Sequence, residues 1–132
     1  MRSGSTLSKP RVLLVDDNQA ILDCLVRMLG RDYTIVGAIR DGPRMLDAVA
    51  ILKPDIVVMD ISMPEMSGLE LAAELRQLPT TAHLFLFSAS VDRRDREIAE
   101  RLQLHVISKV DRVSLFQTMK MLHEESTARR SA

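Results

Sequence analysis

The chain has 132 residues, of which 27% are charged and 46% apolar, a balance typical of one globular domain with a single core. Its 18 Lys and Arg residues equal its 18 Asp and Glu residues, so no net charge attracts nucleic acid or an anionic membrane. The single cysteine, Cys24, excludes an intrachain disulfide and a cysteine-based zinc site. We find no apolar stretch as long as a membrane span and no signal peptide, so we expect a cytoplasmic protein that contacts no membrane.

The two ends of the chain differ in composition from the middle. Residues 1–9 are polar and rich in serine, which predicts a disordered leader. Residues 124–132 are also polar, which predicts a tail or the start of a linker. The apolar runs lie between these segments, so we expect one domain over residues 10–123.

Short apolar runs alternate along the domain with segments of helical periodicity. The runs predict strands at residues 11–15, 34–39, 55–60, 84–87 and 104–107. The segments between and after them predict helices between residues 18 and 30, 43 and 50, 68 and 78, 92 and 102, and 112 and 123. A helix in every connection is the crossover that parallel pairing needs. We therefore predict an α/β fold, with a doubly wound five-stranded parallel sheet in the order 2-1-3-4-5 and helices on both faces.

Capping residues mark the ends of several predicted helices. Asn18 is placed to cap the first helix, and Gly30 is placed to stop it. Pro43 suits the first turn of the second helix. Ser67 and Glu70 have the spacing of a capping box for the third.

Polar residues follow four of the predicted strands at the point where each strand ends. They are Asp16 and Asp17 after the first strand, Asp60 after the third, Ser88 after the fourth and Lys109 after the fifth. In an open parallel sheet the carboxyl ends of the strands share one edge, and ligands bind there. The topology therefore predicts that these five side chains gather around one site.

The chemistry of this set is that of phosphoryl transfer. Three crowded carboxylates repel one another, and a hard divalent cation such as Mg²⁺ relieves the repulsion. A lysine supplies a compact positive charge for a phosphoryl oxygen, and a serine supplies a hydroxyl donor. A carboxylate can itself attack phosphorus. We therefore predict a Mg²⁺-dependent site at this edge, with Asp60 at its centre.

Four motifs together resemble the receiver domain of bacterial two-component response regulators, the CheY-like version of the flavodoxin-like fold. They are VLLVDD at residues 12–17, VVMDISMPEMSGLEL at 57–71, FSAS at 87–90 and SK at 108–109. The resemblance covers roughly residues 10–123. It implies a phosphorelay protein that takes a phosphoryl group from a sensor histidine kinase, or from a phosphotransfer protein, and then switches a protein-interaction face.

The resemblance implies a role for each matching acid. Asp60 resembles the phosphoacceptor and would also contact the metal. Asp17 resembles the direct Mg²⁺ ligand, and Asp16 resembles its partner through a water molecule. The backbone carbonyl of Ser62 resembles a further metal ligand.

The resemblance also implies roles for residues at the ends of the fourth and fifth strands. Ser88 resembles the switch hydroxyl that moves to the phosphoryl group, and Ala89 the small residue that leaves room for it. Lys109 resembles the lysine that pairs first with the acceptor and then with the phosphoryl oxygen. Ser62 and Ser90 would border the path of the hydrolytic water and tune the lifetime of the aspartyl phosphate.

Three positions depart from the usual pattern of the family. Val110 follows the lysine where the family usually has Pro, and Val106 stands where it usually has Tyr or Phe. Gln103-Leu104 replaces the common Gly-Ala before the fifth strand. The acid set is complete, whereas the face that signals to an output domain or a target protein, built in the family from helix four, strand five and helix five, is altered. A homodimer through that face is expected by analogy only.

The sequence leaves other functions open. A phosphate-independent binding module on the same fold is the main alternative, which the missing aromatic and proline favour and the intact acid set disfavours. A flavin carrier would need a hydroxyl-rich and glycine-rich loop after the first strand, where this chain has Asp16-Asp17-Asn18. A phosphatase with an aspartyl intermediate would need differently spaced acids and a cap domain. We therefore expect a phosphoacceptor that catalyses its own phosphorylation and dephosphorylation, not a turnover enzyme.

Overall fold

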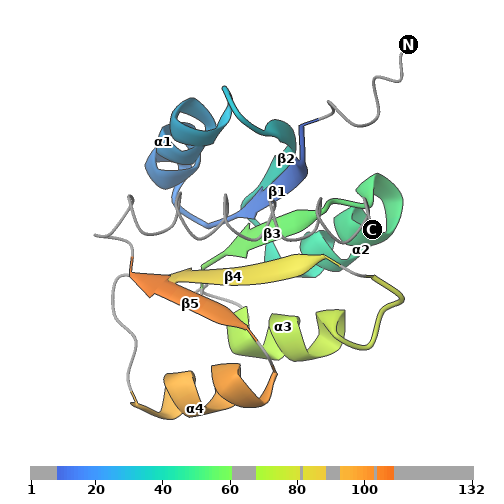
Figure 1. Ribbon diagram of the computed structural model, residues 1–132, viewed down its shortest axis with the longest axis vertical. Helices are drawn as coiled ribbons and strands as arrows, with labels where there is room; N and C mark the ends of the chain where they lie inside the picture. The colour runs from blue at the N-terminus through green and yellow to red at the C-terminus, as the bar shows by residue number, and fades with distance from the viewer. Residues whose placement is uncertain (1–8, 61–67, 81, 89–92, 103, 109–132) are drawn as a thin grey trace, which may run out of the picture.

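A five-stranded parallel sheet forms the centre of the molecule (Figure 1). The computed structural model describes residues 9–60, 68–80, 82–88, 93–102 and 104–108. The strands lie in the order β2-β1-β3-β4-β5, as predicted. Their bounds are β1 Arg11–Val15, β2 Thr34–Ile39, β3 Ile56–Met59, β4 His83–Ser88 and β5 His105–Ser108.

A helix follows each of the first four strands, and each helix packs on one of the two faces of the sheet (Figure 1). The helices are α1 Gln19–Leu29, α2 Gly42–Leu52, α3 Gly68–Leu75 and α4 Arg93–Arg101. α1 lies on one face, and α2, α3 and α4 lie on the other. This doubly wound arrangement confirms the predicted fold, since right-handed crossovers from a parallel sheet distribute helices over both faces. The predicted helix at residues 112–123 lies outside the described residues.

Each face of the sheet has its own apolar core. Under α1, the buried residues of β1, β3 and β4 pack against Leu22, Leu25 and Leu29. Under α2, α3 and α4, alternate residues of the same strands pack against side chains that include Met45, Leu71 and Leu75. Every residue of β3 is buried, as expected for a central strand covered on both faces. The two cores hold β1 and β3 rigidly, and with them whatever follows these strands.

Side-chain caps fix where α1 and α2 begin. The Asn18 Oδ1 atom accepts hydrogen bonds from the backbone N–H groups of Ala20 and Ile21, at 2.9 and 3.2 Å. One carboxylate oxygen of Asp41 accepts a bond of 3.1 Å from the N–H of Arg44. These bonds satisfy donors that a helix cannot satisfy internally, so the cap predicted at Asn18 is confirmed. The capping box predicted at Ser67 and Glu70 includes a residue outside the described part of the chain.

Gly30 ends α1 as predicted, although not through a left-handed turn. Its φ is −62°, in the right-handed region, and its N–H donates to the carbonyl oxygen of Val26. A Cβ atom at this position would lie 2.7 Å from that oxygen, closer than real contacts allow. Here, glycine is required for close approach rather than for a positive φ.

The left-handed helix end is instead at Lys53, which follows α2. Its φ and ψ are 49° and 60°, and its N–H donates to the Val49 carbonyl oxygen at 3.0 Å. Lys53 is the one non-glycine residue with a positive φ among the residues that the structure describes. A side chain with a Cβ atom is strained in this conformation.

One extra residue interrupts the pairing of β2 with β1. Val12 pairs with Ile35, whereas the next residue, Leu13, pairs with Gly37. Val36 is therefore bulged, and the pairing then continues regularly to Val15 and Ile39. The bulge keeps both Val36 and Ile39 on the side of α2 and α3, although they are three residues apart.

None of the helices in the described ranges is both long enough and apolar enough to cross a membrane.

Replacing Lys53 with glycine is expected to stabilise the domain. The left-handed conformation costs a residue with a Cβ atom about 1 kcal/mol or more, and part of this is offset by the extra backbone freedom of glycine in the unfolded chain. Lys53→Gly should therefore raise the free energy of unfolding in urea by up to about 1 kcal/mol. Lys53→Ala is the control and should have little effect, since alanine meets the same strain. Equal effects of the two variants would contradict this account.

Candidate functional site

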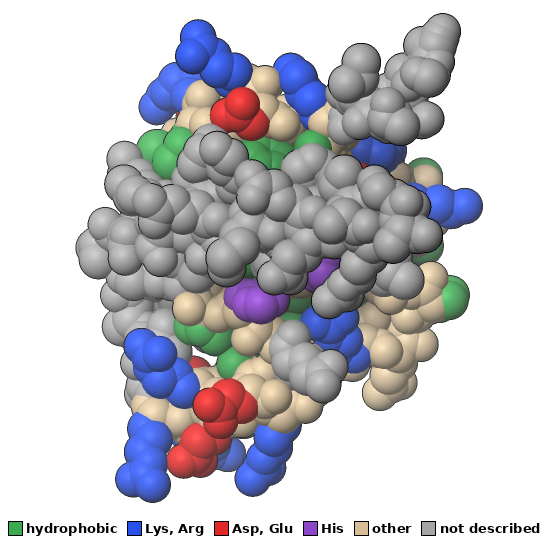
Figure 2. Space-filling model, viewed as in Figure 1, with side chains coloured by type: hydrophobic (Ala, Val, Ile, Leu, Met, Phe, Trp, Pro, Cys, Tyr) green, Lys and Arg blue, Asp and Glu red, His purple; other side chains and the backbone are tan. Residues whose placement is uncertain are grey.

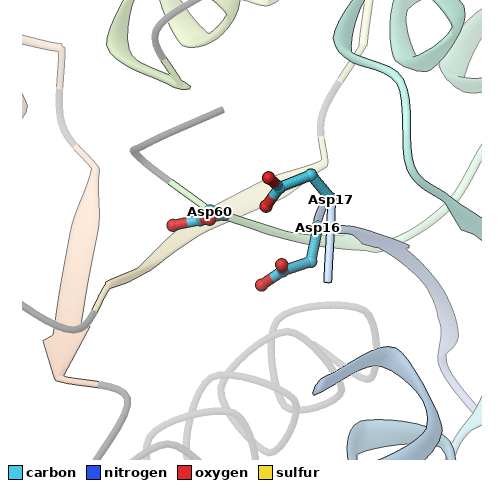
Figure 3. A group of neighbouring side chains, drawn as sticks. All are labelled: Asp16, Asp17 and Asp60. Atoms are coloured by element: carbon cyan, nitrogen blue, oxygen red, sulfur yellow. The ribbon is translucent and has the colours of Figure 1, made fainter. Parts of the chain in front are cut away.

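Three carboxylates meet at the carboxyl edge of the sheet, where Figure 3 shows them extending from the ends of two strands. Asp16 and Asp17 follow β1, and Asp60 follows β3. The two strands are neighbours, with Val15 paired to Met59, so the residues after them lie side by side. One carboxylate oxygen from each acid lies within 4.8 Å of those of the other two.

Two of the three acids have little contact with water. Asp16 is 2% exposed and Asp60 is 4% exposed, while Asp17 is half-buried. Burial raises the cost of each negative charge, and the proximity of the other two adds repulsion. A bound cation opposes both costs. The structure therefore favours a positively charged ligand at this edge.

The backbone holds the acids by continuing the sheet beyond the strands. The N–H of Asp16 donates to the carbonyl oxygen of Ile39, and that of Asp60 donates to the carbonyl oxygen of Val15, each at 3.0 Å. Both bonds extend a strand ladder by one residue. The positions of Asp16 and Asp60 are therefore as well fixed as those of the buried strands themselves.

The turn after β1 adds two further restraints. One carboxylate oxygen of Asp16 accepts a bond of 2.9 Å from the N–H of Asn18, whose side chain in turn caps α1. The carbonyl oxygen of Asp17 accepts two bonds from the Arg40 guanidinium, from Nε at 3.2 Å and from Nη2 at 3.1 Å. The acid pair is thus tied to α1 on one side and to the end of β2 on the other.

Arg40 is a residue that the sequence analysis did not single out. The signal was present, since Arg40 directly follows the second strand and the order 2-1-3-4-5 places that strand beside the first. An arginine on its own is commonly a solvated surface residue, which is why the sequence analysis assigned no role to Arg40.

The structure brings together the three predicted acids and places one other predicted residue at the same edge. Ser88 is the last residue of β4, which pairs with β3. In the same strand, Leu86 pairs with Met59, so Ser88 lies one residue beyond the level of Asp60 along the strand direction. The predicted site residues Ser62, Ala89, Ser90 and Lys109 lie outside the described residues, and their roles stay predictions.

Val106 lies on β5 where the resemblance would expect an aromatic ring. It pairs with Leu86 and packs, partly buried, against the apolar core under α2, α3 and α4. On the opposite face of the same strand, His105 stacks on Phe85, with ring centroids 5.0 Å apart. At position 106, β5 thus presents a short branched side chain that is already packed. Val110 and Gln103 lie outside the described residues.

The acid cluster fits a magnesium ion by the chemistry of its atoms. Mg²⁺ prefers carboxylate oxygens, together with water and phosphate oxygens, and needs few protein ligands. Asp16, Asp17 and Asp60 each offer one such oxygen within reach of a common point. Three protein oxygens would leave coordination positions of such an ion open for water and a phosphoryl oxygen.

Comparison with known proteins agrees with this geometry. Residues 12–119 match the family described as the response regulator receiver domain, and the chain belongs to that family. The match covers both β1 and the acids after it, as well as the β3 segment and Asp60.

Individual relatives support the same assignment. The response regulator PleD of Caulobacter vibrioides is 38% identical over 88 residues, which are 65% of this chain and 19% of that protein. A LuxR-family two-component response regulator from Aurantimonas sp. SI85-9A1 has a TM-score of 0.80 at 25% identity, over 87% of this chain and 85% of the other. A CheY-like receiver domain protein from Methanospirillum hungatei JF-1 shares the fold, with a TM-score of 0.83 at 21% identity, over 93% and 99%.

The chain is similar to only a part of its longer relatives. It spans 19% to 29% of the length of the curated proteins that it matches, among them PleD and the response regulator MprA of several mycobacteria.

Removing one acid should stabilise the protein in the absence of metal. Asp60→Asn keeps the shape of the side chain but removes one of three mutually repelling charges. We expect the free energy of unfolding in EDTA to rise by about 1 to 3 kcal/mol, since two unit charges within 4.8 Å of each other repel by roughly 3 kcal/mol at the effective dielectric constant near a protein surface. Mg²⁺ should raise the melting temperature of the wild type and have little effect on the variant.

Asp47→Asn is the matched control, since it removes one carboxylate from the exposed side of α2. It should leave both the stability in EDTA and the response to Mg²⁺ unchanged. A wild-type-like response to Mg²⁺ in Asp60→Asn would show that the metal binds elsewhere.

Proposed function

We propose that this receiver domain accepts a phosphoryl group on Asp60 in a Mg²⁺-dependent reaction and thereby switches a protein-interaction face. The observation that carries the proposal is the convergence of three buried or half-buried carboxylates at the end of β1 and β3 in a member of the receiver family. The donor would be the phosphohistidine of a sensor kinase or of a phosphotransfer protein in the cytoplasm.

The surroundings of the three acids support a division of roles. One oxygen of Asp16 is already occupied by the N–H of Asn18, which suits an acid that orients the site and reaches the metal through water. Asp17 belongs to the same turn but is half-buried, which suits a direct metal ligand. Asp60 follows the strand buried on both faces, which suits an acceptor that must meet its donor in one orientation. The backbone carbonyl of Ser62 would complete the metal ligands.

The reaction exchanges one bond to phosphorus for another. A carboxylate oxygen of Asp60 forms the new bond to phosphorus as the bond from the histidine nitrogen breaks, and that nitrogen keeps the electron pair and takes up a proton. When bound, the metal neutralises charge on the phosphoryl oxygens. Lys109 would hold a phosphoryl oxygen, Ser88 would donate its hydroxyl to another, and Ala89 would leave the space for this.

The same site would also remove the phosphoryl group. Water attacking phosphorus from the side opposite the Asp60 oxygen would release phosphate and restore the carboxylate. Ser62 and Ser90 would border that path and set the lifetime of the phosphorylated form. The domain would thus catalyse its own phosphorylation and dephosphorylation without acting as a turnover enzyme.

The signal would leave through α4 and β5 to an output domain or a target protein. α4 carries both Arg and Asp or Glu side chains, which Figure 2 shows as blue and red groups at the lower end of the view. Arg93 and Glu97 form an exposed ion pair there, with 3.2 Å between the arginine nitrogen and the carboxylate oxygen. Such a surface suits contacts with a charged partner or with a second copy of the domain. Because Val106 is aliphatic, coupling between Ser88 and the face formed by α4 and β5 would have to proceed without the movement of an aromatic ring.

Intact mass measured after incubation with acetyl phosphate and Mg²⁺ tests the proposal. The wild type should gain the mass of one phosphoryl group, and Asp60→Asn should gain none because an amide is a poor nucleophile. Asp47→Asn should behave like the wild type, and EDTA should abolish the gain in every variant.

The result can also favour the alternative. A wild type that gains no mass but changes its spectrum with beryllofluoride would have a competent site that needs its kinase or loses phosphate quickly. A protein that does neither would be a phosphate-independent binding module, and the proposal would be wrong.

A further inference from the structure

Arg40 contacts the turn that carries two of the three acids. It is the first residue after β2, and its exposed side chain reaches across to the adjacent turn after β1. Its Nε and Nη2 atoms both donate to the carbonyl oxygen of Asp17, at 3.2 and 3.1 Å. The two residues are 23 positions apart in the sequence, so the contact exists only in the folded sheet.

We propose that Arg40 is a positioning residue for the metal site and fixes the peptide that follows Asp17 so that the Asp17 carboxylate faces the metal. This inference rests on the proposed function, because it assigns Asp17 to the metal. Two bonds from one planar guanidinium to one oxygen restrain the orientation of that peptide, and the torsion angles on either side of it determine where the Asp17 side chain points.

Arg40 is the side chain that holds the carbonyl oxygen of this peptide. On its amino-terminal side, the N–H of Asp16 is held by the Ile39 carbonyl oxygen. The N–H of the same peptide, which is that of Asn18, donates to the Asp16 carboxylate, and the Asn18 side chain caps the first turn of α1. The two guanidinium bonds restrain the carbonyl oxygen, the other polar group of this peptide. Without them, the Asp17 carbonyl would lose the partner that ties it to β2.

Geometry, and not charge, is the expected source of the effect. The guanidinium is exposed, so water and salt screen its charge. Its two hydrogen bonds go to a carbonyl oxygen and not to a carboxylate. A positive charge near the site would also repel Mg²⁺, so a purely electrostatic role predicts tighter metal binding when the charge is removed. A positioning role predicts the opposite.

Mg²⁺ binding measured by isothermal titration calorimetry separates these possibilities. Outer partners that orient metal ligands typically contribute a factor of 10 to 100 in affinity, so Arg40→Gln should weaken Mg²⁺ binding about tenfold. Arg40→Lys keeps the charge but not the planar pair of donors, and it should weaken binding severalfold. Arg44→Gln is the matched control, because it removes the same charge from an exposed arginine at the start of α2, and it should bind like the wild type.

Melting temperatures in EDTA show whether the fold is intact. Arg40→Gln and Arg40→Lys should melt close to the wild type, since the two bonds restrain a turn at the surface and not the core. If Arg40→Gln does not fold, the milder Arg40→Lys variant decides the matter through its Mg²⁺ affinity. Acetyl phosphate labelling of the same proteins should fall in parallel with Mg²⁺ affinity.

The outcomes separate this inference from the proposed function. A wild type that binds Mg²⁺, together with Arg40 variants that bind it equally well or more tightly, would overturn the positioning role and leave the proposed function intact. A wild type that does not bind Mg²⁺ at all, and whose mass does not change with acetyl phosphate, would overturn the proposed function and this inference with it. Weaker Mg²⁺ binding in both Arg40 variants, at an unchanged melting temperature in EDTA, would establish the positioning role of Arg40.

Discussion

Repulsion among three carboxylates is the constraint on which the architecture of this domain depends. In the unfolded chain, Asp60 would lie far in space from the Asp16-Asp17 pair, and the repulsion between them would be weak. Folding forces the three together with little water around them. The free energy for this comes from the apolar cores on both faces of β1 and β3, which bury all of β3 and all of β1 except Arg11. Bringing the acids together thus costs free energy, which the burial of the apolar cores offsets. A bound cation would lower this cost.

That arrangement explains why the strands before the acids are so uniformly apolar. A strand with one solvent-facing side would tolerate small displacements, and the distance between Asp60 and the acid pair would vary with them. β3 has no exposed residue and β1 has one, at its far end, so both are confined from both faces. The bonds from Asp16 and Asp60 to the neighbouring strands carry this confinement one residue further. Precision at the site therefore comes from packing several residues away from it.

The sequence predicted the parts of this structure that depend only on chain order and strand periodicity. The five strands, their order and the meeting of Asp16, Asp17 and Asp60 follow from apolar runs and from the parallel topology. The left-handed conformation of Lys53 could not be predicted, because lysine carries no signal for it and a glycine would have been expected there. The contact between Arg40 and Asp17 was missed for a related reason. It depends on the register between β1 and β2 and on how far one long side chain reaches, and neither is encoded in a local pattern. The roles of Ser88 and Lys109 stay predictions from the resemblance.

The bulge at Val36 gives one strand an unusual tolerance of changes in chain length. Because Val36 has no partner on β1, a chain lacking this one residue could pair Thr34, Ile35, Gly37, Ala38 and Ile39 with β1 in unbroken register. Each remaining side chain would keep its present face, and the strand would still end at Ile39, beside Asp16. The loss would be one partly buried valine on the side of α2. A deletion at Val36 would therefore leave the position of the acids unchanged. A deletion after Gly37 would instead shift the end of β2 and turn Arg40 to the opposite face of the sheet.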